Sequence, residues 1–168
     1  MEVIEAKFLF DVEPSQIEVV VHPQSIIHSG IEFEDHSTIA QLGLPDMRVP
    51  IQFALFYPRR AKNSYKSLSL TEIGSLTFEK PDMETFKCLK LAFDALEIGG
   101  TMPAVLNASN EMCVDMFLNK KISFLDIGNI TEKIMHKHNP VKIDSIETIL
   151  QAEQWTKKSI ASLMNYII

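Results

Sequence analysis

Two carboxylates near the start of the chain, Glu2 and Glu5, have a spacing that could hold a divalent cation. Residues three apart face the same way on an α-helix, so both side chains could reach one cation if oxygen ligands from elsewhere completed its coordination. A Glu-x-x-Glu pair is, however, far more often part of a solvated helix face. The spacing alone therefore favours a solvated pair.

His22, Ser25 and His28 form a second group of reactive side chains. Five residues separate the histidines, a spacing that no common zinc signature uses, so zinc binding is disfavoured. Ser25 and His28 could be a nucleophile and its base, but nothing supplies the acidic partner or the sharp turn of an acyl-transfer site. His22, which precedes Pro23, is most simply a residue at the end of a strand.

A Pro-Asp-Met corner at 45–47 precedes a predicted helix. A short carboxylate at such a place commonly accepts hydrogen bonds from nearby backbone N–H groups, which would suffice to explain Asp46. His136 and His138 are expected at a helix C-terminus, where positive charge is favourable, and otherwise on the surface. The basic stretch 59–66 is expected to be a solvated linker.

The first half of the chain predicts a mixture of short elements. Apolar residues crowd one side of a helix over 2–10, with Glu2 and Glu5 opposite, and the β-branched run IEVVV at 17–21 predicts a buried strand. Alternating apolar residues on both sides of a turn at 34–37 predict an antiparallel hairpin from Ile27 to Leu42 with one wet face.

A helix and an extended arm are expected to follow. Pro50 suits the first position of a helix that ends before Pro58, because a proline N–H is not needed there. Residues 59–82 have few large apolar side chains and are interrupted by Gly74 and Pro81. They predict a long arm without a helix, which connects two bodies with a boundary near Pro81.

Beyond Pro81 the periodicity is helical and predicts four antiparallel helices with short connections. Gly99-Gly100 should end the first, Thr101 should begin the second, Ser123 and Asp126 should cap the third, and the last should begin at Asp144 or Ser145. The residues expected to face inward are Leu89, Phe93, Leu96, Leu106, Cys113, Phe117, Ile127, Ile130, Ile134, Ile149, Ile160, Leu163 and Ile167.

The fold class is therefore α+β: a partial mixed or antiparallel sheet with flanking helices, an extended linker and a C-terminal four-helix bundle. The 168 residues are 46% apolar and 23% charged, which is typical of a globular protein and excludes a disordered or collagen-like chain. The net charge of -6 gives no support for a nucleic-acid or anionic-membrane partner. Cys88 and Cys113 lie in helical patterns, so buried free thiols and a reducing, cytoplasmic compartment are expected.

Two further properties concern membranes and export. No apolar run approaches the roughly 18 residues of a membrane span. The first residues are acidic and do not form the basic and apolar regions of a signal peptide. A soluble chain without a secretion signal is expected.

Three runs in this sequence resemble the 1-deoxy-D-xylulose 5-phosphate reductoisomerase family: HPQSIIHS at 22–29, AQLGLPDMR at 40–48 with Pro50 after it, and LNASNE at 106–111. The resemblance extends from EVIEAKFLF at the start through Thr77-Phe78 and CLKLA at 88–92 to about Phe117. It implies the C-terminal portion of that enzyme: the second half of the catalytic domain at 1–58, the linker arm at 59–82 and the helical bundle at 83–168. The family's nucleotide-binding domain and the first half of its catalytic domain have no counterpart here.

The resemblance also implies an activity. The family's enzymes rearrange 1-deoxy-D-xylulose 5-phosphate and reduce the product with NADPH to 2-C-methyl-D-erythritol 4-phosphate, with Mg²⁺ or Mn²⁺, in isoprenoid precursor biosynthesis. They are homodimers, and a bacterial cytoplasm or a plastid-type organelle is the implied location. The isolated chain is expected to be inactive and to bind no cofactor tightly. The alternative from another class is a non-catalytic dimerisation or scaffold module.

The resemblance assigns roles to individual residues. Glu2 matches the metal-binding Glu of the family motif Asn-Lys-Gly-Leu-Glu, with Met1 in place of the Leu, and Glu5 matches a Glu that supports the metal ligands. The phosphate-binding Asn and Lys and the other metal ligands have no counterpart in the sequence. Asn107, Asn110 and Glu111 are expected to tie the bundle to a neighbouring domain, not to do chemistry.

The other assigned residues belong to the pocket. His28 matches a histidine near the active site that could bond a carboxylate or a substrate oxygen, and Ser25 matches a serine near the bound ligand. Pro45 and Met47 match the residues that line the pocket beside the nicotinamide and the substrate. These four residues and Glu2 are the expected site.

Overall fold

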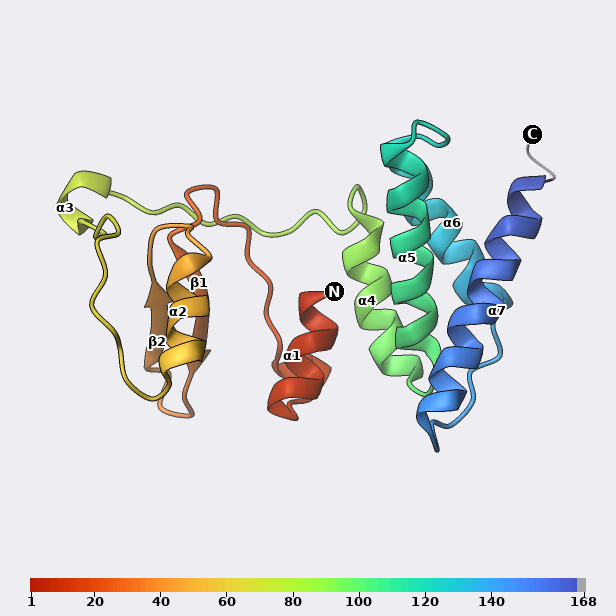
Figure 1. Cartoon of the computed structure of the whole chain (residues 1–168), viewed down its shortest axis with the longest axis horizontal. Coiled ribbons are helices and arrows are strands. Elements are labelled where there is room, and N and C mark those ends of the chain that lie inside the picture. Colours follow the sequence, from red (N-terminus) through yellow and green to blue (C-terminus); the bar gives the residue numbers. More distant parts are fainter. Residues whose placement is uncertain (166–168) are drawn as a thin grey trace. The chain divides into compact units, whose positions relative to one another are not determined.

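The computed structural model describes residues 1–165, which fold into two compact units (Figure 1). Unit 1 combines residues 1–18 with residues 82 onward, and unit 2 consists of residues 19–81. The first helix thus belongs to the same unit as the C-terminal helices. The division predicted from the sequence, at 1–58, 59–82 and 83–168, stays a prediction.

The predicted four-helix bundle is confirmed in unit 1. Its helices are α4 (Lys87–Ile98), α5 (Met102–Leu118), α6 (Phe124–Lys137) and α7 (Ile146–Asn165). Helix α5 packs against the other three, and the colours in Figure 1 show that successive helices run in opposite directions. Short connections join helices that pack side by side, as the sequence predicts.

The core of the bundle is built largely from the residues that the sequence predicts. Cys113, Ile134 and Ile160 are fully buried. The prediction for α4 is shifted by one position around the helix: Leu91, Ala92 and Ala95 are buried, whereas the predicted stripe of Leu89, Phe93 and Leu96 is half-buried. Small alanines let α5 approach α4 closely. A prediction of the buried face from the large apolar residues alone does not find these alanines. The predicted inward residue Ile167 lies outside the described residues.

Capping groups fix where the bundle helices begin and end. The Ser123 backbone N–H and hydroxyl both donate to the Asp126 carboxylate, at 2.9 and 2.6 Å, which confirms the predicted capping pair of α6. Gly99 and Gly100 have φ of 73° and 52° and end α4, as predicted. At the start of α5, the Thr101 N–H donates to the Val141 carbonyl at 3.0 Å.

Helix α1 (Glu2–Phe10) packs against α4 and is followed by a 3-10 turn, η1 (Pro14–Gln16). Val3 and Ile4 are buried, but Phe8, Leu9 and Phe10 are 66–76% exposed. The helix is confirmed, and the expectation that all its apolar residues share one side is wrong. The apolar side chains of α1 are distributed around the helix, so packing against α4 buries only some of them.

Unit 2 contains the predicted hairpin. Strands β1 (Ile27–Glu32) and β2 (Thr38–Leu42) pair antiparallel, with Ile31 opposite Ile39. In the turn, the Asp35 carboxylate accepts from the Ser37 N–H at 3.0 Å and from its hydroxyl at 2.6 Å, and His36 has φ of 65°. The expected single wet face is wrong, because Ile31 and Ile39 are 63% and 65% exposed and neither face of the hairpin is buried.

Two short helices complete unit 2. Helix α2 (Arg48–Phe56) begins two residues before Pro50, which therefore lies in its first turn, and it ends before Pro58 as predicted. The arm, expected to lack helix, contains the four-residue helix α3 (Leu70–Ile73). Ser69 caps α3 by accepting the Glu72 N–H at 3.4 Å.

The buried strand predicted at 17–21 is wrong. Only Val21 pairs with another segment, at Glu79, and Val20 and Val21 are 51% and 42% exposed. A β-branched run forms a strand when neighbouring strands lie beside it, and the described residues supply a single bridge. Ile26, 5% exposed, is the one buried residue of unit 2.

Candidate functional site

A tight turn presents Ser25. The Ser25 N–H donates to the His22 carbonyl at 3.0 Å, which closes a turn over Pro23 and Gln24. Proline at the second position pre-sets the backbone for such a turn. Ser25 itself has φ of 50°, an uncommon left-handed conformation for a residue other than glycine, and its side chain is exposed.

Gly43 joins this turn to the Pro-Asp-Met corner. The Gly43 N–H donates to the Ile26 carbonyl at 2.9 Å, and the Gly43 carbonyl lies 3.1 Å from His28 Nε2. Because a carbonyl only accepts, His28 carries its proton on Nε2 and keeps Nδ1 free to accept. Gly43 was not predicted as a site residue, although it directly precedes the Leu44-Pro45 step in the run AQLGLPDMR.

The corner itself is held by an ion pair. Arg48 donates three side-chain hydrogen bonds of 2.6–3.1 Å to the Asp46 carboxylate, and the Arg48 backbone N–H donates a further one at 3.0 Å. The hydrogen bonds from Arg48 hold the pKa of Asp46 below its ordinary value. The prediction that the Asp46 carboxylate accepts a hydrogen bond from a nearby backbone N–H is therefore confirmed. Arg48, which also lies 4.4 Å over the Tyr65 ring, was not predicted.

The structure thus places four predicted pocket residues on connected elements of unit 2. Ser25 lies in the turn, His28 on β1, and Pro45 and Met47 at the corner that Gly43 links to both. All four are exposed, Met47 by 71%. An exposed polar turn beside an exposed thioether and proline can accept a ligand with both polar and flat apolar parts.

The two predicted metal-site residues lie on α1 in unit 1. Glu2 and Glu5 are exposed and one turn apart. Within residues 1–165 there is no group of three or more His, Cys, Asp or Glu side chains that could hold a metal ion. Hard cations such as Mg²⁺ and Ca²⁺ take six or more oxygen ligands, some of them water, so two carboxylates alone are an incomplete donor set.

His22 is more than the end of a strand. Its Nδ1 lies 2.8 Å from the Thr77 carbonyl, and its ring stacks on Phe78 with centroids 4.7 Å apart and an interplanar angle of 18°. Donation from Nδ1 leaves Nε2 with a lone pair, and this buried atom has no hydrogen-bond partner in the described part of the chain. The ring is therefore fixed by the arm.

His138 is not the surface residue that the sequence predicted. Its Nε2 lies 2.7 Å from the Thr101 hydroxyl, and its ring lies 4.7 Å from that of Trp155. Burial lowers the pKa of His138, so the imidazole is held neutral and does not contribute a charge at the end of α6. Thr101 and Trp155 are distant in sequence, which explains why the local pattern misses this contact.

The cysteines are free, as predicted, with Cys113 buried and Cys88 half-buried. Burial raises the pKa of the Cys113 thiol to about 11 and also raises the pKa of Cys88. Protonated thiols of this kind are unreactive.

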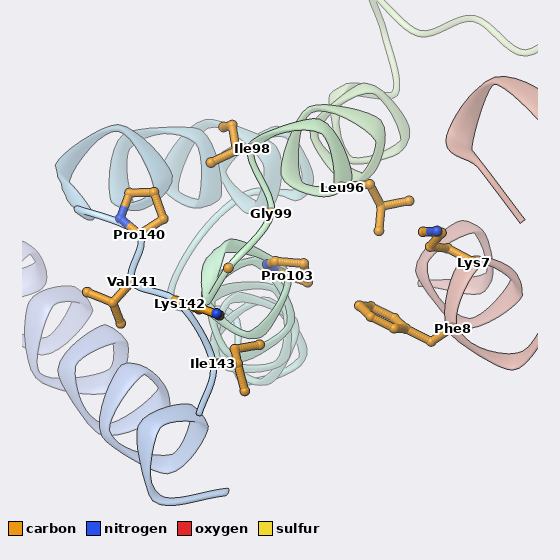
Figure 2. Close-up of a pocket in the computed structure, with 11 residues that line it drawn as sticks. Lys7, Phe8, Leu96, Ile98, Gly99, Pro103, Pro140, Val141, Lys142 and Ile143 are labelled. Atoms are coloured by element: carbon orange, nitrogen blue, oxygen red, sulfur yellow. The ribbon is translucent and has the colours of Figure 1, made fainter. Parts of the chain in front are cut away.

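A hollow of about 520 Å³ opens in unit 1, between α1, the end of α4, the start of α5 and the loop at 140–143 (Figure 2). Its lining is mainly apolar, with Phe8, Pro103 and Ile143 facing it, and Lys7 and Lys142 at its border. None of the residues Glu2, Glu5, Ser25, His28, Pro45 and Met47 lines it. The residues that line the hollow belong to unit 1, whereas the turn and the corner belong to unit 2.

None of the helices in the described residues combines the length and the apolar character that crossing a membrane requires.

Comparisons with known proteins agree on one family. Residues 42–159 match the model of the DXP reductoisomerase C-terminal domain. The 1-deoxy-D-xylulose 5-phosphate reductoisomerase of Acetivibrio thermocellus is 55% identical over 98% of this chain, and that of Pelotomaculum thermopropionicum is 52% identical over 98%. The chain spans 43% and 44% of the length of these two proteins, which is less than half of either.

Solved structures give the same result. The reductoisomerase of Zymomonas mobilis in complex with NADPH matches with a TM-score of 0.90 at 43% identity, covering 97% of this chain and 43% of that one. A DOX-P reductoisomerase in complex with NADPH, fosmidomycin and magnesium matches with a TM-score of 0.90 at 38% identity, covering 99% of this chain and 43% of that one.

Proposed function

The chain belongs to the 1-deoxy-D-xylulose 5-phosphate reductoisomerase family, and from that premise we propose that it is the C-terminal part of an enzyme with this activity. The intact enzyme would convert 1-deoxy-D-xylulose 5-phosphate to 2-C-methyl-D-erythritol 4-phosphate with NADPH and Mg²⁺ or Mn²⁺. The observation that carries the proposal is identity above 50% over nearly the whole chain to enzymes of this name.

Glu2 would provide one carboxylate to the metal site of the intact enzyme. Its position at the first residue of α1 leaves the side chain exposed, and Glu5 lies one turn further along, where it would support Glu2 without touching the metal. When bound, the divalent cation supplies a Lewis acid to neighbouring oxygens and NADPH supplies a hydride. Further ligands would come from outside residues 1–165, which bring no group of three or more ligating side chains together.

The turn and the corner of unit 2 would form one wall of the substrate and nicotinamide pocket. His28 is positioned through Gly43, so its Nδ1 can accept a proton or a hydrogen bond from a substrate hydroxyl. The exposed Ser25 hydroxyl can bond a ligand oxygen, and Pro45 and Met47 offer an apolar surface to a flat ring.

A chimera tests the proposal. This chain would replace the matched 43% of the Acetivibrio thermocellus enzyme, and NADPH oxidation would be followed with 1-deoxy-D-xylulose 5-phosphate and Mg²⁺. We expect substrate-dependent turnover. The matched control is the same chimera with Glu2→Gln, which keeps the shape of the side chain and removes its charge.

The result that would overturn the proposal is a chimera that unfolds cooperatively and binds NADPH but does not turn over the substrate. Cooperative unfolding and NADPH binding would exclude misfolding as the reason. The chain would then fit the alternative of a non-catalytic dimerisation or scaffold module.

The hairpin would lie at a homodimer interface. Ile31 and Ile39 face each other across the strands and are about two-thirds exposed, and a two-stranded sheet has open edges that pair readily. Sedimentation at about micromolar concentration should find a dimer that Ile39→Lys converts to a monomer. Leu70→Lys, at an equally exposed residue outside the hairpin, should leave the dimer intact. A monomeric wild-type chain would contradict this placement.

The cytoplasm would be the location of the intact enzyme. The support is the pair of free thiols, Cys88 and Cys113, which a reducing compartment preserves.

A further inference from the structure

Two distant segments of unit 2 are fastened together at the point where its chain enters and leaves. The Val21 N–H donates to the Glu79 carbonyl and the Glu79 N–H donates to the Val21 carbonyl, both at 2.9 Å. We call the contacts between residues 21–24 and residues 77–79 the neck clip. This reciprocal backbone pair is its first part.

The second and third parts use side chains. The Gln24 amide N–H donates to the Thr77 hydroxyl at 2.8 Å, while the Thr77 N–H and hydroxyl donate to the Gln24 carbonyl oxygen, both at 3.2 Å. The His22 Nδ1–H donates to the Thr77 carbonyl at 2.8 Å, and the His22 ring stacks on Phe78. The arm therefore holds residues 21, 22 and 24, three of the four residues that immediately precede Ser25.

The neck clip acts on a strained turn. Ser25 has φ of 50°, a conformation that is unfavourable for a residue with a Cβ atom, so an unconstrained segment would leave it. The turn is closed by a hydrogen bond from Ser25 to His22 itself, and Gln24 lies between them. Because the arm binds both His22 and Gln24, it fixes the two residues that define the direction in which Ser25 points.

We propose that arm residues Thr77 and Phe78 position the substrate pocket, by holding His22 and Gln24 so that Ser25 keeps its left-handed conformation. This inference rests on the proposed function, in which Ser25 belongs to the pocket. His22 is accordingly a positioning residue that acts through Ser25. The segment at 77–79 is then part of the site's framework, although it lies more than fifty residues away in sequence.

Hydrogen exchange in this chain tests the first half of the inference. His22→Leu removes the hydrogen bond to Thr77 and the stacked ring, and it should raise the exchange rate of the Ser25 amide roughly tenfold. His22→Asn returns an N–H donor near the position of Nδ1 and should restore part of the protection. Thr77→Val should also expose the Ser25 amide, whereas Thr71→Val, the same change at an exposed arm residue outside the neck clip, should not.

The inference is overturned if His22→Leu exposes the Thr77 and Glu79 amides while the Ser25 amide exchanges at the wild-type rate. The neck clip would then fasten the arm without controlling the turn. This measurement needs no substrate, so its outcome is independent of whether the proposed activity is correct.

Kinetics in the chimera test the second half. His22→Leu should lower kcat/KM roughly tenfold, the equivalent of about 1.4 kcal/mol of transition-state stabilisation. Combined with Ser25→Ala, it should cause little further loss, because its effect passes through Ser25. Equal losses in both backgrounds would show a structural role only and would overturn the positioning claim. An inactive chimera would instead contradict the proposed function and leave the exchange result standing.

Discussion

Glu2 is the residue in this chain whose loss should damage the proposed chemistry most. In the active chimera, Glu2→Gln should lower kcat and the affinity for Mn²⁺, with kcat falling about 10²-fold, because a charged contact to the metal is lost. Glu5→Gln, one turn along the same exposed face, should cost about tenfold as the loss of a supporting group. The measurement is kcat and Mn²⁺ affinity for both variants. A larger loss for Glu5→Gln would mean that the assignment of α1 is wrong by one turn.

His138 should make the stability of unit 1 depend on pH. The Thr101 hydroxyl accepts the Val141 N–H at 3.2 Å, so its own hydrogen is available to His138 Nε2, which a protonated ring could not accept. The folded pKa of His138 lies below its ordinary value of 6.5, so the unfolded chain binds more protons between these two values. Stability is therefore fully present above about pH 6.5 and is lost as the pH falls through the window down to the folded pKa.

Urea unfolding at pH 7.5 and pH 5.5 measures this effect. His138→Gln should reduce the difference between the two pH values, because glutamine does not titrate. His136→Gln is the matched control, since His136 is exposed in the last turn of the same helix. An unchanged pH dependence in His138→Gln would show that other groups cause it.

The junction between α4 and α5 offers a matched pair of glycines. Both have positive φ, but a Cβ on Gly100 would lie 2.5 Å from the Val141 carbonyl oxygen, whereas a Cβ on Gly99 would meet nothing within 4 Å. Gly99→Ala should cost about 1 kcal/mol from backbone strain alone. Gly100→Ala should cost a further 1–3 kcal/mol or so, because the backbone of the 140–143 loop beside the hollow in Figure 2 must move.

Thermal unfolding followed by circular dichroism gives the comparison. Equal losses for the two variants would show that the 140–143 loop adapts without cost. A Gly99→Ala variant less stable than Gly100→Ala would contradict the geometry.

The sequence predicted the elements that depend on residues close together in the chain. It did not predict those that depend on contacts between residues far apart in the chain. The bundle helices follow from periodicity, and the Ser123–Asp126 cap and the Gly99-Gly100 stop are complete within a few residues. The strand expected at 17–21 failed because its β-branched run needs partners, and only Glu79 is one. Whether the large or the small apolar residues of α4 are buried depends on how closely α5 packs against it. The hydrophobic periodicity of α4 alone carries no information on that distance.

The two units of the molecule should unfold separately. The bundle buries a continuous apolar core, whereas unit 2 buries Ile26 alone. Ile134→Ala should destabilise unit 1 by about 2–5 kcal/mol, since a fully buried side chain leaves a cavity, while the amides of unit 2 keep their exchange rates. Ile26→Ala should do the reverse. Loss of protection in both units from either change would show a single cooperative body.

The sequence predicted only part of the candidate site. Ser25, His28, Pro45 and Met47 stand in runs whose similarity to a family marks them, yet their residue types and spacing did not identify a reaction. Gly43 was not singled out, and His22 was interpreted only as the end of a strand, because their roles depend on contacts to residues far along the chain, the Ile26 carbonyl and Thr77. Glu2 cannot be assigned from its own surroundings, because the described residues bring no third ligand to it.

The reciprocal hydrogen bonds between Val21 and Glu79 have a consequence for how such a protein can change over generations. A segment whose first and last residues lie side by side is topologically an insert. Recombination can remove, replace or lengthen such a segment while the two flanking parts of the chain stay close enough to be joined. Closing the gap demands only a short loop, and each doubling of loop length costs about 0.6 kcal/mol. Residues 1–18 joined to residues 82 onward by a short loop should accordingly fold as a helical protein, and other inserts should be accepted at the same junction.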